Sequence, residues 1–508
     1  MLVQALWTLA LAGAVCYYLC IIRSRRQMLA KLPSPPASSW FLGHAREVMG
    51  DVSGTYPNPA LSWLEEYGCA YYFRLLHLGR VALADPVGLK HVLVTHASRY
   101  PRDDTTRTFL RTYMSGDSLV SVKGADHASM RKALNPHFGL AHLKLFVPIF
   151  VAHTNAMLAH FTRAIDTNTP VNLHKVWSLL TLDIMGSSMF GYDFGALAGT
   201  NAENNQAYVD AQFPPSIIGM VGTVLVPGWS YLPLPGYARR RRAIATLPGI
   251  VMRVIEAKMA QAIDDHPPQD LLDLMLISDR NMTSAEARVH VQVFMQAGHE
   301  TTSHALSWAI AMLLRYPNVA AKVQAECDAT VARFGSDVSY EAVADLVYVT
   351  AFLKETARCY PAITMLAPRS VTIDDVIPLA DGSSVANPKG TSIYVDLVAV
   401  QRNSKYWTRP NDFCPERFME GSALSNADRE LRGGAGHTFH YLPFSMGEKN
   451  CIGQRFAMLE MQILLVKTLA AVTFKATDRT NLNPSRELVS ITPTCLEVTV
   501  HRRSATTA

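Results

Sequence analysis

The spacing of hydrophobic positions changes along the chain and predicts two kinds of element. Between residues 69 and 95 apolar and polar residues alternate, with turn signals near Gly79 and at Asp85-Pro86. A period of two predicts strands in this N-terminal part of the chain. Apolar residues recur at helical spacing after Cys451 and, over a longer range, before Pro317. Strands are therefore expected early in the chain and helices further on.

The longest predicted helix begins after Thr283 and ends before Pro317. Thr283 and Glu286 form a capping box, and the proline stops the helix. It has about 30 residues and is roughly 45 Å long, enough to cross a whole domain. Its middle reads Ala297-Gly298-His299-Glu300-Thr301-Thr302, which places a glycine, an acid and two hydroxyls where a buried helix needs apolar residues. On the residues alone the interpretation is a local bend, because threonine can bond back to a carbonyl one turn earlier.

A second unusual stretch lies just before the helix that is predicted after Cys451. It reads Phe444-Ser445-Met446-Gly447-Glu448-Lys449-Asn450-Cys451-Ile452-Gly453. It holds a single cysteine in a tight loop between glycines. The N–H groups of such a loop, with the positive end of the next helix, favour a thiolate. No second cysteine or histidine stands at zinc-ligand spacing, whereas one thiolate suits an iron held by a porphyrin. The alternative is a buried free cysteine, the usual state of a lone one.

Composition narrows the class of protein. The 508 residues contain no repeat, low-complexity tract or long polar linker, which favours one large domain. The 47 basic and 42 acidic residues give a net charge of only +5, too even to indicate a nucleic-acid-binding protein. The eight cysteines form no Cys-x-x-Cys pair, which favours a reducing compartment over a disulfide scaffold.

Residues 2–22 form an uncharged apolar run with one strongly polar residue. As a helix they would span about 31 Å, enough to cross a bilayer. A cleaved signal peptide is the alternative, but no basic residue precedes the run and no small-x-small site follows it. Basic residues follow at 23–31 instead, so the rest of the chain is expected on the cytosolic side. We predict a transmembrane anchor over residues 1–31 and a stiff proline-rich hinge over residues 32–42.

The pattern around Cys451, Phe-x-x-Gly-x-basic-x-Cys-x-Gly, resembles the haem-binding signature of the cytochrome P-450 superfamily. The family usually has arginine where this chain has Lys449, which offers a charge to a haem propionate but no two-pronged contact. The segment 297–302 resembles the family's Ala-Gly-x-acid-Thr-Thr motif. The resemblance implies a mainly α fold with a smaller β region near the N-terminus, and a haem-thiolate catalytic domain over residues 43–508.

The resemblance also implies roles for individual residues. Cys451 is expected to ligate the iron of haem b, and Glu300 and Thr301 to relay protons to dioxygen. Residues at the family's positions for holding the cofactor are His127, Arg131, Arg369, Lys449 and Phe444. Spacing alone favours a solvated pair for His127 and Arg131, because they share one helix face.

Three further segments match positions of the family. The residues implied for a buried network behind the haem are Glu355, Arg358 and Arg417, and those implied for the pocket wall are Ala362, Ile363 and Leu366. The apolar, proline-rich segment 212–236 corresponds to the region that roofs the pocket and dips into the membrane; the alternative is a buried irregular connection. The basic run 239–242 is expected to be solvated or to face lipid headgroups.

The implied reaction is insertion of one oxygen atom of dioxygen into an apolar small molecule. NADPH supplies the electrons through a separate flavoprotein reductase, with cytochrome b5 as a further donor, since the chain has no Gly-x-Gly-x-x-Gly fingerprint. The implied location is the endoplasmic reticulum membrane, with a single span and a cytosolic catalytic domain. Two alternatives stay open: a family member that rearranges hydroperoxides or dehydrates its substrate, and a membrane-bound haem sensor or carrier. Intact Glu300 and Thr301 favour the monooxygenase.

Overall fold

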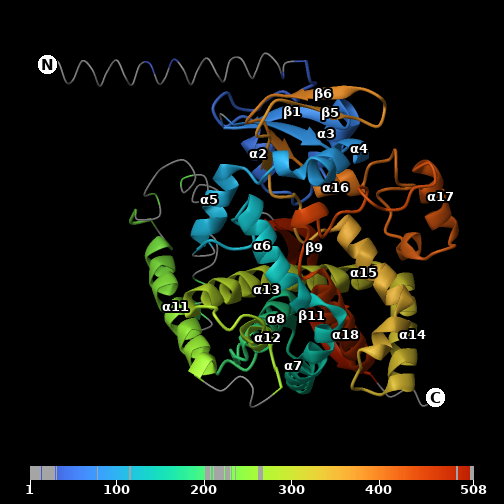
Figure 1. Ribbon diagram of the computed structural model, residues 1–508. Coiled ribbons are helices and arrows are strands. Elements are labelled where there is room, and N and C mark those ends of the chain that lie inside the picture. The colour runs from blue at the N-terminus through green and yellow to red at the C-terminus, as the bar shows by residue number, and fades with distance from the viewer. Residues whose placement is uncertain are drawn as a thin grey trace.

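The computed structural model describes most of the chain after residue 30. The described ranges are 31–76, 78–113, 116–200, 232–234, 236–260, 267–487 and 490–503, with Gly13, Cys16, Leu29, Gln206, Ala207, Asp210, Gly222 and Trp229. The predicted anchor and most of segment 212–236 lie outside these residues. Helices make up most of the described chain, and the long helix α13 (Ser284–Arg315) crosses its middle (Figure 1). The mainly α fold with a smaller β region is confirmed.

The helices of the described residues lie on both sides of α13 in the chain. Those before α13 are α2 (Ala45–Met49), α3 (Ala60–Tyr67), α4 (Pro86–Lys90), η1 (His91–Thr95), η2 (Ala97–Arg99), α5 (Asp104–Tyr113), α6 (Gly124–Leu134), η3 (Asn135–Phe138), α7 (Leu140–Asp166), α8 (Leu173–Phe190), α11 (Tyr237–Ala260) and α12 (Leu271–Ser278). Those after it are α14 (Pro317–Phe334), η5 (Glu341–Asp345), α15 (Val347–Cys359), α16 (Leu397–Gln401), η6 (Pro415–Phe418), α17 (Ala423–Leu431), η7 (Gly447–Lys449) and α18 (Gln454–Ala471). The capping box predicted at Thr283 is present, and α13 ends before Pro317 as expected.

The main sheet lies at the top of Figure 1 and has the strand order β1-β2-β7-β4. Its strands are β1 (Ala70–Leu75), β2 (Leu78–Leu83), β7 (Ser392–Tyr394) and β4 (Arg369–Ser370). The strand prediction is confirmed as far as Leu83 and is wrong from there to residue 95. The reason is Asp85, whose carboxylate accepts N–H bonds from Val87 and Gly88 at 2.9 Å and so caps helix α4.

The turn predicted near Gly79 lies just before that residue, between Leu75 and Leu78. Gly79 lies within β2 and pairs with Arg74 of the antiparallel strand β1. A Cβ atom on residue 79 would lie 2.6 Å from the hydroxyl oxygen of Tyr72. Glycine therefore permits close approach of an aromatic ring here and does not form a turn.

Three small sheets complete the β region of the described residues. They pair β5 (Asp375–Pro378) with β6 (Ser384–Asn387), β9 (Asn481–Glu487) with β10 (Ser490–Cys495), and β3 (Val171–Asn172) and β8 (Val472–Ala476) with β11 (Glu497–Arg502). The isolated bridge between Ile363 and Ser490 brings the start of β10 beside the segment that follows α15.

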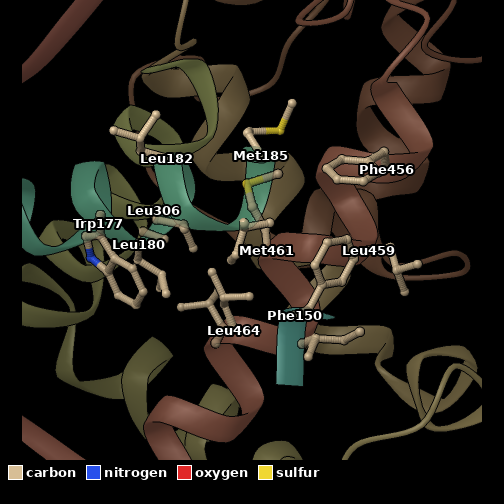
Figure 2. Packing of buried hydrophobic residues seen from close by; sticks show 14 of the residues in the cluster. Phe150, Trp177, Leu180, Leu182, Met185, Leu306, Phe456, Leu459, Met461 and Leu464 are labelled. Carbon is tan, nitrogen blue, oxygen red and sulfur yellow. The ribbon is translucent and has the colours of Figure 1, made fainter. Parts of the chain in front are cut away.

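The largest hydrophobic core lies between α7, α8, α13 and α18. Figure 2 shows Trp177, Leu180 and Met185 of α8 facing Leu306 of α13 and the apolar side of α18. Gly298 in the middle of α13 faces α8, where a Cβ atom would lie 2.6 Å from Sδ of the flexible Met185 side chain. The helix α13 is α-helical throughout.

The proline-rich segment predicted as a hinge lies along the main sheet. The N–H of Tyr72 in β1 donates to Pro33 O at 2.8 Å, and a ring nitrogen of His44 is 3.0 Å from Pro35 O. These bonds fix the segment against β1 and α2.

One helix in the described part of the chain is long and apolar enough to cross a membrane, namely α7. Its residues Phe146, Phe150 and Phe161 are buried in the core against other helices. Core packing accounts for its apolar composition.

Candidate active site

A cavity of about 930 Å³ lies between α13, the loop before α18 and the segment from Ala362 to Arg369. Much of its wall is apolar and comes from Leu110, Phe138, Met185, Met189, Phe294 and Met461. Such a cavity suits a largely apolar ligand of small-molecule size.

Cys451 reaches this cavity from the loop between η7 and α18. Its N–H donates to Phe444 O at 2.8 Å, and Phe444 also lines the cavity. Burial raises the pKa of the Cys451 thiol, while the Gly453 N–H and Arg131 act in the opposite direction. The Gly453 N–H thus acts in the direction predicted for the loop, whereas burial has the larger and opposite effect on the pKa of the thiol.

The Cys451 loop is fixed from behind by η1. Gly447 has φ +78°, a left-handed conformation, and a Cβ atom there would collide with the carbonyl oxygen of Leu93 in η1. Only glycine fits both the backbone angle and the space. The loop position thus depends on contact with an element more than 350 residues earlier in the chain.

Three cations meet in the cavity wall: Arg102, Arg369 and Lys449. Burial, together with Arg102 and Arg369, lowers the pKa of Lys449 to about 8. Lys449 Nζ is buried and donates no hydrogen bond within the described residues, and its ion pair with Glu448 spans 3.9 Å. A buried ammonium group without an acceptor is costly, so this part of the wall fits a ligand with anionic oxygens.

Arg102 is a cavity residue that the sequence analysis missed. Its Nη1 donates to Val120 O at 2.5 Å, and a bridge pairs its backbone with that of Arg369. Burial, then the nearby charge of Arg369, lowers the pKa of Arg102 to about 10. It lies in an irregular segment without a motif, so only the fold brings it to the site.

His127 and Arg131 lie on one face of α6 as predicted, but neither is among the described residues that line the cavity. Burial, with Lys449 and Arg102, lowers the pKa of His127 to about 4, so its ring is neutral at pH 7. Arg131 donates to the carbonyl and side-chain oxygens of Asn450 at 2.6 and 2.7 Å. Arg131 therefore holds the residue next to Cys451.

Glu300 and Thr301 of α13 line the same cavity as Cys451. Thr301 Oγ1 donates to Ala297 O at 2.8 Å, the back-bond expected for a threonine in a helix. The hydroxyl oxygen keeps its lone pairs for a donor in the cavity. The Glu300 carboxyl group and the Thr301 hydroxyl group thus belong to neighbouring residues of the cavity wall.

The segment after α15 forms another wall. Ala362, Ile363 and Leu366 line the cavity, as the sequence predicts. Bridges from Ile363 to Ser490 and from Met365 to Asp396 hold the segment in place.

The buried network predicted behind this wall is present. Glu355 accepts from Arg358 Nε at 2.7 Å and from Arg417 Nε at 3.2 Å, and all three side chains are fully buried. Arg417 also pairs with Asp428, and its guanidinium faces the Trp407 ring. Asp428 and Trp407 could not be predicted from the sequence, because no fixed spacing relates them to Arg417.

Comparison with known proteins identifies the family of the chain. The profile of the family described as cytochrome P450 matches residues 33–500. The chain belongs to the cytochrome P450 family. It is 26% identical to cytochrome P450 4F3 of Homo sapiens over 491 residues, which cover 92% of this chain and 89% of that protein. It is 25% identical to cytochrome P450 97B2, chloroplastic, of Glycine max over 80% of this chain and 76% of that one. Cytochrome P450 monooxygenase 205 of Postia placenta is 25% identical over 90% of this chain and 88% of its own.

As a member of this family, the protein is a haem-thiolate monooxygenase, and the cofactor of the family is haem. The described residues fit that cofactor. Cys451 offers its sulfur to the cavity, and Gly453 leaves room beside it, since even a Cβ atom there would lie 4.0 Å from Sγ. The buried Lys449 ammonium has only the long ion pair with Glu448 and no hydrogen-bond acceptor within the described residues, and a haem propionate would supply that acceptor.

Proposed function

We propose that Cys451 ligates the haem iron of a monooxygenase that inserts one oxygen atom of dioxygen into an apolar small molecule. The observation that carries the proposal is one apolar cavity whose wall holds Cys451, a cluster of cations, and the pair Glu300 and Thr301. When bound, the haem supplies the iron at which dioxygen is activated.

The cations are proposed to orient the cofactor. Lys449, Arg102 and Arg369 present positive charge where the carboxylates of haem b are expected, and Phe444 covers part of the same wall. Neutral His127 borders these cations and can donate a hydrogen bond without adding charge. Arg131 is proposed to act through Asn450, by holding the Cys451 loop in position.

Glu300 and Thr301 are proposed to move protons into the cavity. Because Thr301 Oγ1 donates to Ala297 O, its lone pairs can accept a hydrogen bond from a cavity water. Glu300 can replace the proton that such a water gives up, since its carboxyl group lines the same wall.

The electrons are proposed to come from NADPH through a separate flavoprotein reductase, with cytochrome b5 as a further donor. The absence of a dinucleotide fingerprint from the sequence supports a separate reductase. A monooxygenase predicts oxygen uptake that requires NADPH, the reductase and a substrate together. Turnover of an added hydroperoxide without NADPH would instead favour the rearranging alternative, and haem binding without any turnover would favour a sensor or carrier.

The chain is further proposed to be a single-pass protein of the endoplasmic reticulum membrane, with residues 1–31 as anchor, 32–42 as hinge and 43–508 as cytosolic catalytic domain. The uncharged run 2–22 and the basic residues after it support this topology. One relative carries the description chloroplastic, so the compartment needs its own test. Deletion of residues 2–22 is expected to release the protein from membranes while haem binding stays intact; loss of haem would show that the run belongs to the catalytic domain.

A further inference from the structure

Polar residues form a stripe along the cavity side of α13. Gln296, Glu300 and His304 all line the cavity and follow one another at intervals of four residues. Side chains at this interval lie on one face of a helix, one turn apart. Much of the rest of the wall is apolar. His304 is therefore the polar group of the cavity wall that follows Glu300 by one helical turn.

His304 also connects the cavity with α8. It is only 4% exposed, and the centroid of its ring lies 5.3 Å from that of His174, with an angle of 33° between the ring planes. His174 lies in the first turn of α8 and, unlike His304, is partly exposed to solvent. Two neighbouring imidazoles thus lead from the solvent side of α8 to the cavity.

Hydrogen bonds determine the tautomer of His174. The Ser307 hydroxyl donates to Ser303 O at 2.7 Å, so its oxygen accepts from His174 Nδ1, which is 3.1 Å away. Nδ1 therefore carries the proton of the neutral ring, and Nε2 is the nitrogen that can take up another. Histidine suits such a transfer because it gains and loses a proton near neutral pH.

We propose that His174 and His304 carry protons from solvent to Glu300. The inference rests on the proposed function, because insertion of one oxygen atom of dioxygen releases the other atom as water and consumes two protons. His174 takes up a proton at Nε2 and gives it to His304, which gives it to the carboxylate left when Glu300 has donated its own. Both rings return to the neutral state, and no electron moves. The two histidines act through Glu300 and are not catalytic residues themselves.

A third histidine in the same region does not belong to this path. His299 is on α13 but is not among the described residues that line the cavity, and its Nε2 lies 3.1 Å from Ser178 Oγ. Burial, with the neighbouring His304 and His174, lowers the pKa of His299 to about 3, so its ring stays neutral at pH 7. His299 is thus a buried histidine of the same helix that cannot relay a proton.

The test uses the haem-loaded protein with its reductase, NADPH and dodecane as an apolar probe. NADPH that is not recovered as hydrogen peroxide counts the turnovers in which both protons arrived and the O–O bond was broken. The ratio of this NADPH to that recovered as peroxide is expected to fall at least about threefold in His304→Asn and in His174→Asn, because asparagine cannot carry the proton. His299→Asn is the matched control and is expected to keep the wild-type ratio.

A combined variant separates a proton path from a structural role. Glu300→Gln lowers the ratio by itself, and adding His304→Asn is expected to lower it no further, because His304 acts only through Glu300. A further fall in the combined variant, or a wild-type ratio in either asparagine variant, would overturn the inference. If the carbon-monoxide spectrum shows that His304→Asn has lost its haem site, the variant of the partly exposed His174 carries the test.

Oxygen uptake keeps the two proposals apart. Wild type without NADPH-dependent oxygen uptake rejects the proposed function. Normal uptake with unchanged ratios in the asparagine variants rejects only the proton path through His174 and His304.

Discussion

Substitution of Thr301 distinguishes two roles of its hydroxyl group, delivery of protons and stabilisation of the helix. Its hydroxyl is bonded to Ala297 O within α13, so Thr301→Ala removes one helix back-bond and one cavity hydroxyl. If the hydroxyl positions a proton donor, the variant is expected to keep consuming NADPH and oxygen but to release more hydrogen peroxide and less oxidised product. The measurement is the ratio of product formed to NADPH consumed, with the same reductase.

Ser303→Ala is the matched control for this variant. Ser303 makes a similar back-bond, to Glu300 O at 2.9 Å, but is buried and does not belong to the described cavity lining. Its ratio is expected to equal that of wild type. An unchanged ratio in Thr301→Ala would leave the hydroxyl with a structural role only.

Glu460 is expected to make the free energy of unfolding depend on pH. It is fully buried on α18, and burial raises its pKa well above 4.5, with an opposing contribution from the Thr302 hydroxyl. The folded protein therefore keeps a proton that the unfolded chain releases, so stability falls as pH rises from 4.5 toward the raised pKa, by about 1.4 kcal/mol per pH unit for this group. Glu460→Gln removes that loss and is expected to be more stable than wild type at pH 8, with a smaller gain at pH 5.

Thermal unfolding of the haem-loaded proteins at the two pH values measures this difference. Glu430→Gln on the surface controls for the change in net charge. A constant difference between Glu460→Gln and wild type at both pH values would mean that Glu460 is ionised in the folded protein.

At the scale of elements, the contact between η1 and η7 fixes the Cys451 loop. A Cβ atom on residue 447 would meet the carbonyl oxygen of Leu93, in addition to the strain of φ +78°. Gly447→Ala is expected to displace η7 and weaken haem retention, with a destabilisation of about 2 kcal/mol or more. Haem loss to an excess of apomyoglobin measures the retention.

Gly434 offers a control with the same kind of backbone and no crowding. Its φ is +86°, and nothing lies within 4 Å of a Cβ atom placed there. Gly434→Ala therefore carries the backbone strain without the collision, and its haem loss is expected to stay close to that of wild type. Equal haem loss in both variants would show that the contact with η1 does not position the loop.

Elements with strong local signals were predictable from the sequence. The capping box at Thr283 and the breaker Pro317 set the ends of α13 correctly. The prediction failed after Leu83, where a capping aspartate overrides the alternating pattern, and it did not show that Gly79 itself lies within β2 against Tyr72. Propensity and turn signals do not show which distant side chain will cover a glycine.

For the whole molecule, motifs gave Cys451, Thr301 and the pocket wall, because each falls within a short stretch of recognisable spacing. They did not give Arg102, whose place in the cavity depends on a backbone bridge with Arg369, far along the chain. They also gave His127 and Arg131 as cofactor contacts; this stays a prediction, and neither residue is among the described residues that line the cavity. Local motifs thus predict the reaction class better than the shape and charge of the substrate site.

The central claim is that the sulfur of Cys451 ligates the haem iron. The direct measurement is the carbon-monoxide difference spectrum of the reduced protein, for wild type and Cys451→Ser. Cys495→Ser serves as the control, since Cys495 lies on β10 and is not among the described residues that line the cavity. Wild type and Cys495→Ser are expected to show the band of a thiolate-ligated haem, and Cys451→Ser to lack it, because a serine hydroxyl is a far weaker donor to iron. A Cys451→Ser protein that retains the thiolate band would contradict the account.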